Sequence, residues 1–265
     1  MLAQHLTKPN LCAALLAAAL FIYLIDALPL VNFIALLILN GAIYALYSLN
    51  QALPHTSLPR TLAHSGLWFA CLILGFFIAL YRPSDFNYPL AFHFTQLDFQ
   101  LYANLGKGLA GALVLVWLWP RSDKAKNIWL SLALALVASS LVIASAKAMG
   151  IPWAFKTPSG IVWFLVINVA LTVLAEEAFF RLLLQENLAK LLGGTKVAIL
   201  SAALVSVAIF ALAHVPPTHK FFALYLIAGG LYCAVYTYTR RLSMAVATHA
   251  AVNILHFTLL PYPLS

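Results

Sequence analysis

The chain has 265 residues, of which 64% are hydrophobic and only 8% are charged. The 15 Lys and Arg and the 7 Asp and Glu cannot form the polar coat of a soluble fold of this length, so the apolar excess must face lipid, and soluble enzymes and extended disordered chains are excluded. The net charge of +8 comes from basic residues scattered between apolar runs, a pattern typical of loop anchors on a membrane protein and not of nucleic-acid binding.

The apolar stretches predict an all-α fold, a polytopic bundle of eight to nine transmembrane helices. A hydrocarbon core about 30 Å thick takes roughly 20 helical residues, and short polar or proline-containing breaks separate stretches of about that length. The predicted spans are 11–27, 30–48, 62–81, 105–119, 128–148, 161–185, 197–214, 221–239 and 243–260. The fourth span is short, and only four residues divide the first two.

The longest segment between spans, residues 82–104, is rich in aromatic side chains. This composition predicts a helix or loop that lies in the membrane interface. With nine spans, more Lys and Arg fall on the N-terminal side of the membrane than on the opposite side. The positive-inside rule therefore predicts a cytoplasmic N-terminus.

Three charged residues interrupt the sixth span, and an ionisable group inside a span is a functional candidate by default. Glu177 and Arg181 are four residues apart, in the order that favours neutralisation on one helix face. Glu176 is rotated from Glu177 by about 100°, so it should point toward a neighbouring helix or a cavity. There its ionisation is set by its neighbours, as a general base requires. The structural alternative is a buried Glu–Arg pair that joins helices, with Glu176 at a cap or at the interface.

Two later spans carry histidines. Phe210 and His214 share a helix face at the end of the seventh span, and His249 and Asn253 share a face in the ninth. Taken alone, His214 is more often a packed residue, and the His249 pair could be an interhelical hydrogen bond. Together with Glu176 they supply a carboxylate, two imidazoles and a carboxamide. This set can activate water and stabilise an oxyanion, so the sequence predicts hydrolysis.

In these residues the chain resembles the CPBP intramembrane proteases, which comprise the type II CAAX prenyl endopeptidases and the bacterial Abi or bacteriocin-processing proteins. The family pattern is EExxxR, FxxxH and HxxxN or HxxxD on successive late helices. Glu176–Arg181, Phe210–His214 and His249–Asn253 match it completely and in order. The resemblance covers about residues 160–256. It divides the chain into N-terminal transmembrane helices of unassigned role (1–150) and a catalytic helix core (151–265).

The resemblance implies an intramembrane endopeptidase that hydrolyses a peptide bond in a membrane-associated protein or peptide, in CAAX-type, leader-peptide or sorting-tail processing. Glu176 would activate the water with assistance from His214. His249 and Asn253 would polarise the scissile carbonyl and hold its oxyanion.

The same resemblance gives supporting roles to three further residues. Glu177 with Arg181 would be a structural and electrostatic support, and Phe210 would pack the helix that presents His214. Outside the motifs, His219 and His256 are expected in loop and lining roles.

On the favoured interpretation no metal is required, because the Asn253 carboxamide is an uncommon zinc ligand and a good oxyanion donor. The alternative is a divalent metal such as zinc, held by His214, His249 and Glu176.

The expected partners are the lipid bilayer and a membrane-associated peptide or protein substrate, with no nucleic acid. The expected location is the bacterial inner membrane. Two other classes remain as alternatives: a membrane transporter or proton or ion relay, and a non-catalytic immunity or scaffold protein. A joint site needs Glu176 and His214 at equal depth. This requires either that the sixth helix extends past Asn187 or that the seventh begins later than predicted.

Overall fold

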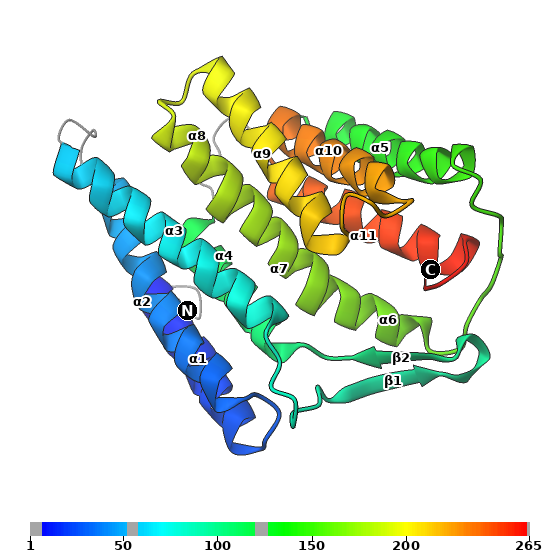
Figure 1. Cartoon of the computed structure of the whole chain (residues 1–265), viewed down its shortest axis with the longest axis horizontal. Helices are drawn as coiled ribbons and strands as arrows, with labels where there is room; N and C mark the ends of the chain where they lie inside the picture. Colours follow the sequence, from blue (N-terminus) through cyan, green and yellow to red (C-terminus); the bar gives the residue numbers. More distant parts are fainter. Residues whose placement is uncertain (1–6, 52–57, 120–126, 264–265) are drawn as a thin grey trace. The chain divides into compact units, whose positions relative to one another are not determined.

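A computed structural model of the chain describes residues 7–51, 58–119 and 127–263 (Figure 1). Within these ranges the fold is all-α apart from one two-stranded hairpin, which confirms the all-α part of the predicted fold class, although fewer helices than the expected eight to nine are long and apolar enough to cross a membrane. The first helices are α1 (Lys8–Leu24), α2 (Leu30–Gln51), α3 (Leu58–Leu80), α4 (Leu105–Leu118) and α5 (Ile128–Ala148). The last are α9 (Lys196–His214), α10 (Phe222–Thr239) and α11 (Leu242–Leu259).

Between α5 and α9 runs one long helix, Ile161–Leu191. Its segments are α6 (Ile161–Ile167), η3 (Asn168–Val173), α7 (Leu174–Glu177), η4 (Ala178–Glu186) and α8 (Asn187–Leu191). The helix therefore extends past Asn187, which is the first of the two alternatives that the sequence left open. Gln185 and Asn187 in this part of the helix are almost inaccessible to solvent.

Every predicted span coincides with a helix. Among the described residues, seven helices are long and apolar enough to cross a membrane, and α1 and α4 are shorter apolar helices. The seven candidate spans are Leu30–Gln51, Pro59–Leu80, Ile128–Ala148, Ile161–Leu191, Lys196–His214, Phe222–Thr239 and Leu242–Leu259. Their length and composition indicate an integral membrane protein.

The prediction of a helix or loop at residues 82–104 is wrong in part, because this segment contains a hairpin of β1 (Leu90–Phe94) and β2 (Phe99–Tyr102). A short 3₁₀ turn, η2 (Thr95–Leu97), joins the strands. Of the aromatic residues in this segment, Phe92 and Phe94 alternate along β1, and Phe99 and Tyr102 lie at the two ends of β2. Phe94 packs edge-to-face on Phe257 of α11 at a centroid distance of 5.2 Å, and Phe257 stacks on Phe164 of α6 at 4.0 Å.

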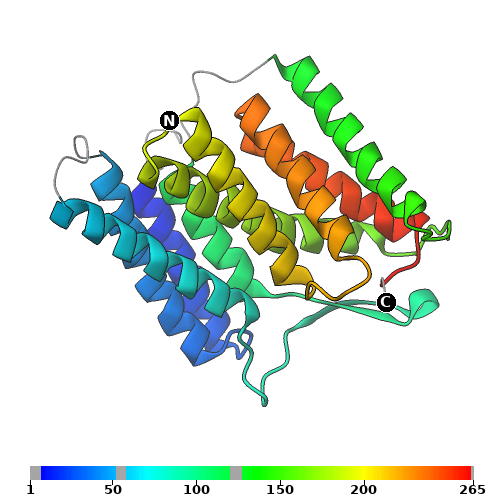
Figure 2. The same ribbon diagram turned by 45° about the horizontal axis from the view of Figure 1, so that its top comes forward.

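The chain forms two compact units that interleave along the sequence. Unit 1 contains residues 1–89, 102–120 and 170–193, and unit 2 contains residues 90–101, 121–169 and 194–265. The predicted division at residue 150 concerns function and stays a prediction. In unit 2, α10 packs against α5, α9 and α11 (Figure 2).

In unit 1, α4 packs along α7 and η4, and glycines allow it to come close. A Cβ atom built at Gly111 would overlap the backbone of Ala175, and one built at Gly108 would lie 2.5 Å from Leu171 Cδ2. Small residues at such contacts let helix backbones approach in a membrane, where packing and not water exclusion drives association. The glycines therefore place α4 directly beside the segment that carries Glu176.

We expect Gly111→Ala to destabilise unit 1 by about 1–3 kcal/mol, because the new methyl group meets backbone that cannot move aside. Gly41→Ala in α2 is the matched control, since a Cβ there has no neighbour within 4 Å. Thermal unfolding in detergent measures both. Equal midpoints for the two variants would contradict the close approach of α4.

Candidate active site

The adjacent carboxylates Glu176 and Glu177 lie in the short helix α7, between two π-helical segments, η3 and η4. A π-helix bonds i to i+5, so each π segment shifts the direction of the side chains that follow it. Such segments are rare in proteins, and those that occur often lie at functional sites. The long helix thus changes register immediately before and immediately after the two glutamates.

Glu177 and Arg181 form the ion pair that their spacing predicts. Arg181 Nε donates to Glu177 Oε2 at 2.8 Å, and both side chains are 0% exposed. Arg181 Nη1 also donates to Gln185 Oε1 at 3.2 Å. The pair keeps two buried charges neutral within one helix, and the support role that the resemblance implies for it stays a prediction.

A chain of polar side chains in unit 1 holds the end of η4. Asn187 Nδ2 donates to the carbonyl oxygens of Leu182 and Leu183, at 2.8 and 3.1 Å. Its Oδ1 then accepts from Asn50 Nδ2 at 3.1 Å, and Asn50 Oδ1 accepts from His64 Nε2 at 2.9 Å. Because the carbonyl oxygens at one end can only accept, each side chain in this series of hydrogen bonds must donate toward them. Sequence reasoning missed these residues, although each is a polar residue at the end of an apolar run.

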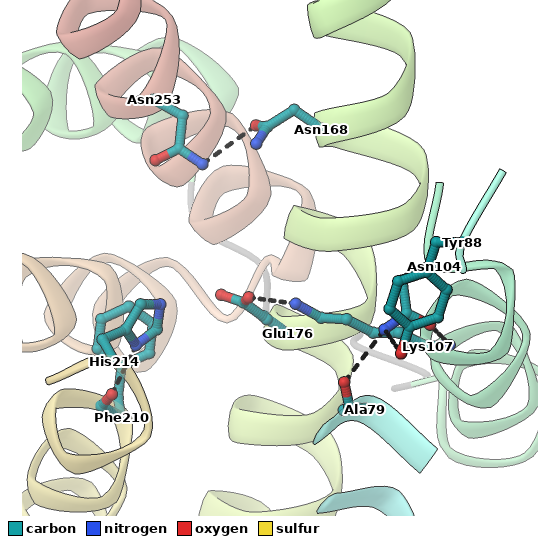
Figure 3. Close-up of polar contacts among 9 residues, drawn as sticks. All are labelled: Ala79, Tyr88, Asn104, Lys107, Asn168, Glu176, Phe210, His214 and Asn253. Atoms are coloured by element: carbon teal, nitrogen blue, oxygen red, sulfur yellow. Dashed lines mark hydrogen bonds and ion pairs between the residues drawn. The ribbon is translucent and has the colours of Figure 1, made fainter. Parts of the chain in front are cut away.

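Glu176 points away from Arg181, toward the neighbouring helix α4, as its rotation from Glu177 predicts. Its Oε1 lies 2.6 Å from Lys107 Nζ, and the two side chains are 11% and 21% exposed (Figure 3). Sequence reasoning missed Lys107, because it lies in the first turn of its helix, where a lysine is typical of a charge at the membrane interface. One signal could have identified it, since it is the only charged residue of α4 and lies between Gly106 and Gly108.

Asn104 holds the first turn of α4 in place. Its Oδ1 accepts from the Lys107 backbone N–H at 3.0 Å, which makes it the N-cap. Its Nδ2 donates to Ala79 O and to the Tyr88 hydroxyl, both at 3.1 Å. Burial raises the pKa of Tyr88, with a smaller opposing effect of Arg82, so the hydroxyl stays protonated at neutral pH.

In unit 2, His214 is oriented by its own helix and by two rings. Its Nδ1 lies 2.7 Å from the Phe210 carbonyl oxygen (Figure 3). Because a carbonyl only accepts, Nδ1 carries a hydrogen, and in the neutral ring Nε2 presents its lone pair. The imidazole also contacts the Phe210 ring at 4.3 Å and stacks on Tyr225 at 5.0 Å between centroids.

His249 belongs to the same cluster of rings. It is 4% exposed and stacks on Tyr232 at 4.5 Å between centroids, with the two planes 16° apart. The Phe210 ring contacts His249 edge-on at 5.9 Å. Phe210 fits against α10 because a Cβ at Gly229 would lie only 2.7 Å from its Cδ1. Phe210 therefore contacts both imidazoles, and Tyr232 is a contact that the sequence did not indicate.

Asn253, one helical turn after His249, donates through Nδ2 to Asn168 Oδ1 at 3.1 Å (Figure 3). Asn168 is the first residue of η3 and lies upstream of Glu176 in the same long helix. It is a further residue that the motifs did not include. Of the other histidines, His219 accepts a hydrogen bond from the Phe221 backbone N–H in the turn after α9, and His256 Nε2 lies 3.0 Å from Pro261 O.

The structure thus groups the predicted site residues in two clusters, one in each unit. Glu176, Glu177 and Arg181 lie in unit 1. Phe210, His214, His249 and Asn253 lie in unit 2. That both clusters act on one substrate stays a prediction. Among the described residues, no three His, Cys, Asp or Glu side chains gather as a metal site.

A family model matches the part of the chain that contains all three motifs. Residues 158–255 match the family described as Rce1-like: Type II CAAX prenyl endopeptidase Rce1-like. No curated protein and no solved structure matches the chain. The family match confirms the resemblance for this part of the chain.

We expect Arg181→Met to cost about 3–5 kcal/mol of stability, because it leaves the Glu177 carboxylate buried without its cation. The double variant Glu177→Met, Arg181→Met should recover most of that loss, since it removes both charges. Unfolding of the two variants in detergent gives the comparison. A double variant as unstable as Arg181→Met would show that the pair does more than neutralise its own charges.

Proposed function

We propose, on the premise that residues 158–255 form an Rce1-like type II CAAX prenyl endopeptidase family domain, that the chain is a membrane-embedded endopeptidase. The observation that carries the proposal is that its two adjacent carboxylates have separate cations. Arg181 neutralises Glu177 inside the long helix, whereas Lys107 reaches Glu176 from another helix. Glu176 is thereby an anionic carboxylate in apolar surroundings, which is the state that a general base needs.

In the proposed reaction, Glu176 takes a proton from water while the water oxygen bonds to the scissile carbonyl carbon. His214 assists through the Nε2 lone pair, which can accept a hydrogen bond from the same water. His249 and Asn253 hydrogen-bond the carbonyl oxygen as it becomes an oxyanion. The C–N bond then breaks, and Glu176 returns its proton to the leaving amine.

The proposed reaction uses no metal ion. The imidazoles of His214 and His249 are groups that commonly bind zinc. The third ligand would be the Glu176 carboxylate, which already contacts the Lys107 ammonium at 2.6 Å. A zinc ion bound to Glu176 would lie beside that ammonium and be repelled by it. The donor set therefore does not fit zinc, and no step depends on one.

The proposed substrate is a membrane-associated protein or peptide, cut in CAAX-type, leader-peptide or sorting-tail processing. Seven candidate membrane spans support a substrate that reaches the enzyme within or beside the bilayer. We place the chain in a bacterial inner membrane with its N-terminus in the cytoplasm, on the distribution of Lys and Arg.

Replacing the base should abolish proteolysis. We expect Glu176→Gln to lower the yield of specific protein termini in membrane and secreted fractions by at least about 100-fold, the lower range for general acid–base catalysis. The measurement compares termini by mass spectrometry in cells that carry the native chain or the variant at equal abundance.

Glu186→Gln is the matched control, because it changes a carboxylate of the same long helix that has no role in the reaction. Cells that carry Glu186→Gln should yield the same protein termini as cells that carry the native chain. If a folded Glu176→Gln protein also gives native termini, the peptidase proposal is wrong, and a transporter or a non-catalytic membrane protein takes its place.

Chelation tests the metal-free reaction. We expect cleavage by isolated membranes to persist after treatment with 1,10-phenanthroline or EDTA, because no step of the proposed reaction uses a metal ion. Loss of cleavage on chelation, with recovery on added zinc, would contradict this.

A further inference from the structure

Lys107 is a charged residue in otherwise apolar surroundings. It is the only charged residue in the apolar helix α4, and its Nζ contacts Glu176 Oε1 at 2.6 Å. The Lys107 side chain is only 21% exposed and its ammonium is directed to Glu176, and an ionisable group held among apolar helices is a candidate for function.

Lys107 is not needed to hold α4 against the long helix. The glycine contacts already bring the α4 backbone against the long helix, at Gly108 with Leu171 and at Gly111 with Ala175. Leu171 lies in η3 just before α7, Ala175 is the second residue of α7, and neither contact involves a charge. The two helices would pack closely with an uncharged residue at position 107.

The backbone of Lys107 is held by contacts that do not involve Glu176. Asn104 caps the turn that carries Lys107 and bonds to Ala79 at the end of α3 and to Tyr88. The ammonium is therefore delivered to Glu176 by a first turn that is fixed through other hydrogen bonds. A cation that is already held in place needs little reorganisation when the charge beside it changes.

The other charges near α7 belong to a different pair. In the described part of unit 1, α4 and η4 pack against α7. The charged residues of η4 are Arg181 and Glu186, and Arg181 binds Glu177. Lys107 is thus the cation that these elements direct to Glu176.

We propose that Lys107 is a positioning residue for the hydrolysis, which keeps Glu176 ionised and holds its carboxylate in one place. This inference rests on the proposed function. When Glu176 takes the proton of water, the ion pair becomes an ammonium beside a neutral acid, and that arrangement favours return of the proton to the leaving amine.

Infrared spectroscopy of the purified protein in lipid tests the inference without any substrate. At neutral pH, Lys107→Met should show the carbonyl stretch of a protonated carboxyl group, and the double variant Lys107→Met, Glu176→Gln should lack it. The native protein and Lys107→Arg should not show it, because each keeps a cation beside Glu176. Lys107→Gln is a second neutral variant for the case that Lys107→Met does not fold.

Cleavage measured at the termini that depend on Glu176 gives the second readout. Lys107→Met should lower it at least about tenfold, since an opposite charge this close favours the ionised carboxylate by roughly that factor or more. Lys107→Arg should restore most of it. Lys190→Met, which removes an exposed lysine of α8, should leave it unchanged.

The two readouts separate the two proposals. If no protonated carboxyl assignable to Glu176 forms in either neutral variant, or if these variants cleave like the native chain, the role of Lys107 is refuted while the peptidase stands. If the native chain produces no termini that depend on Glu176, the peptidase proposal fails, and the infrared result alone decides whether Lys107 sets the charge of Glu176.

Discussion

Every charge placed among apolar helices must be neutralised, and this requirement organises the long helix and its surroundings. The two neighbouring glutamates meet it in different ways. Glu177 is neutralised by Arg181 within its own helix, in a pair with no solvent exposure. Glu176 is neutralised by Lys107 from another helix, in a pair that keeps some exposure. Glu176 can therefore gain a proton without leaving a fully buried charge in the helix, and so the Glu176–Lys107 pair is the one suited to proton transfer.

Close packing by small residues serves both units. In unit 1, Gly111 lets α4 lie on the backbone at Ala175, which brings Lys107 within reach of Glu176. In unit 2, Gly229 makes room for Phe210, whose ring then contacts His214 and His249. In each case the absence of a side chain on one helix positions a functional side chain on another. The π-helical segments on either side of α7 add a local change of register at the two glutamates.

The sequence predicted those features that depend on neighbours along the chain. Apolar runs located the helices, and a spacing of four residues identified Glu177 with Arg181 and Phe210 with His214. It did not predict contacts between distant segments, such as Lys107 with Glu176 and Asn168 with Asn253, because no local pattern specifies which helices pack together. The hairpin was missed for a similar reason. Its aromatic residues suit an interface as well as a strand, and the packing of Phe94 on Phe257 decides between them.

The most direct test of the account uses the purified chain alone in lipid vesicles, with a synthetic peptide that spans a cleavage site found in cells, in water enriched in ¹⁸O. The account predicts two fragments, with ¹⁸O in the new carboxyl terminus, from the native chain, and an intact peptide from folded Glu176→Gln. An intact peptide with the native chain, or equal cleavage by both proteins, would contradict it.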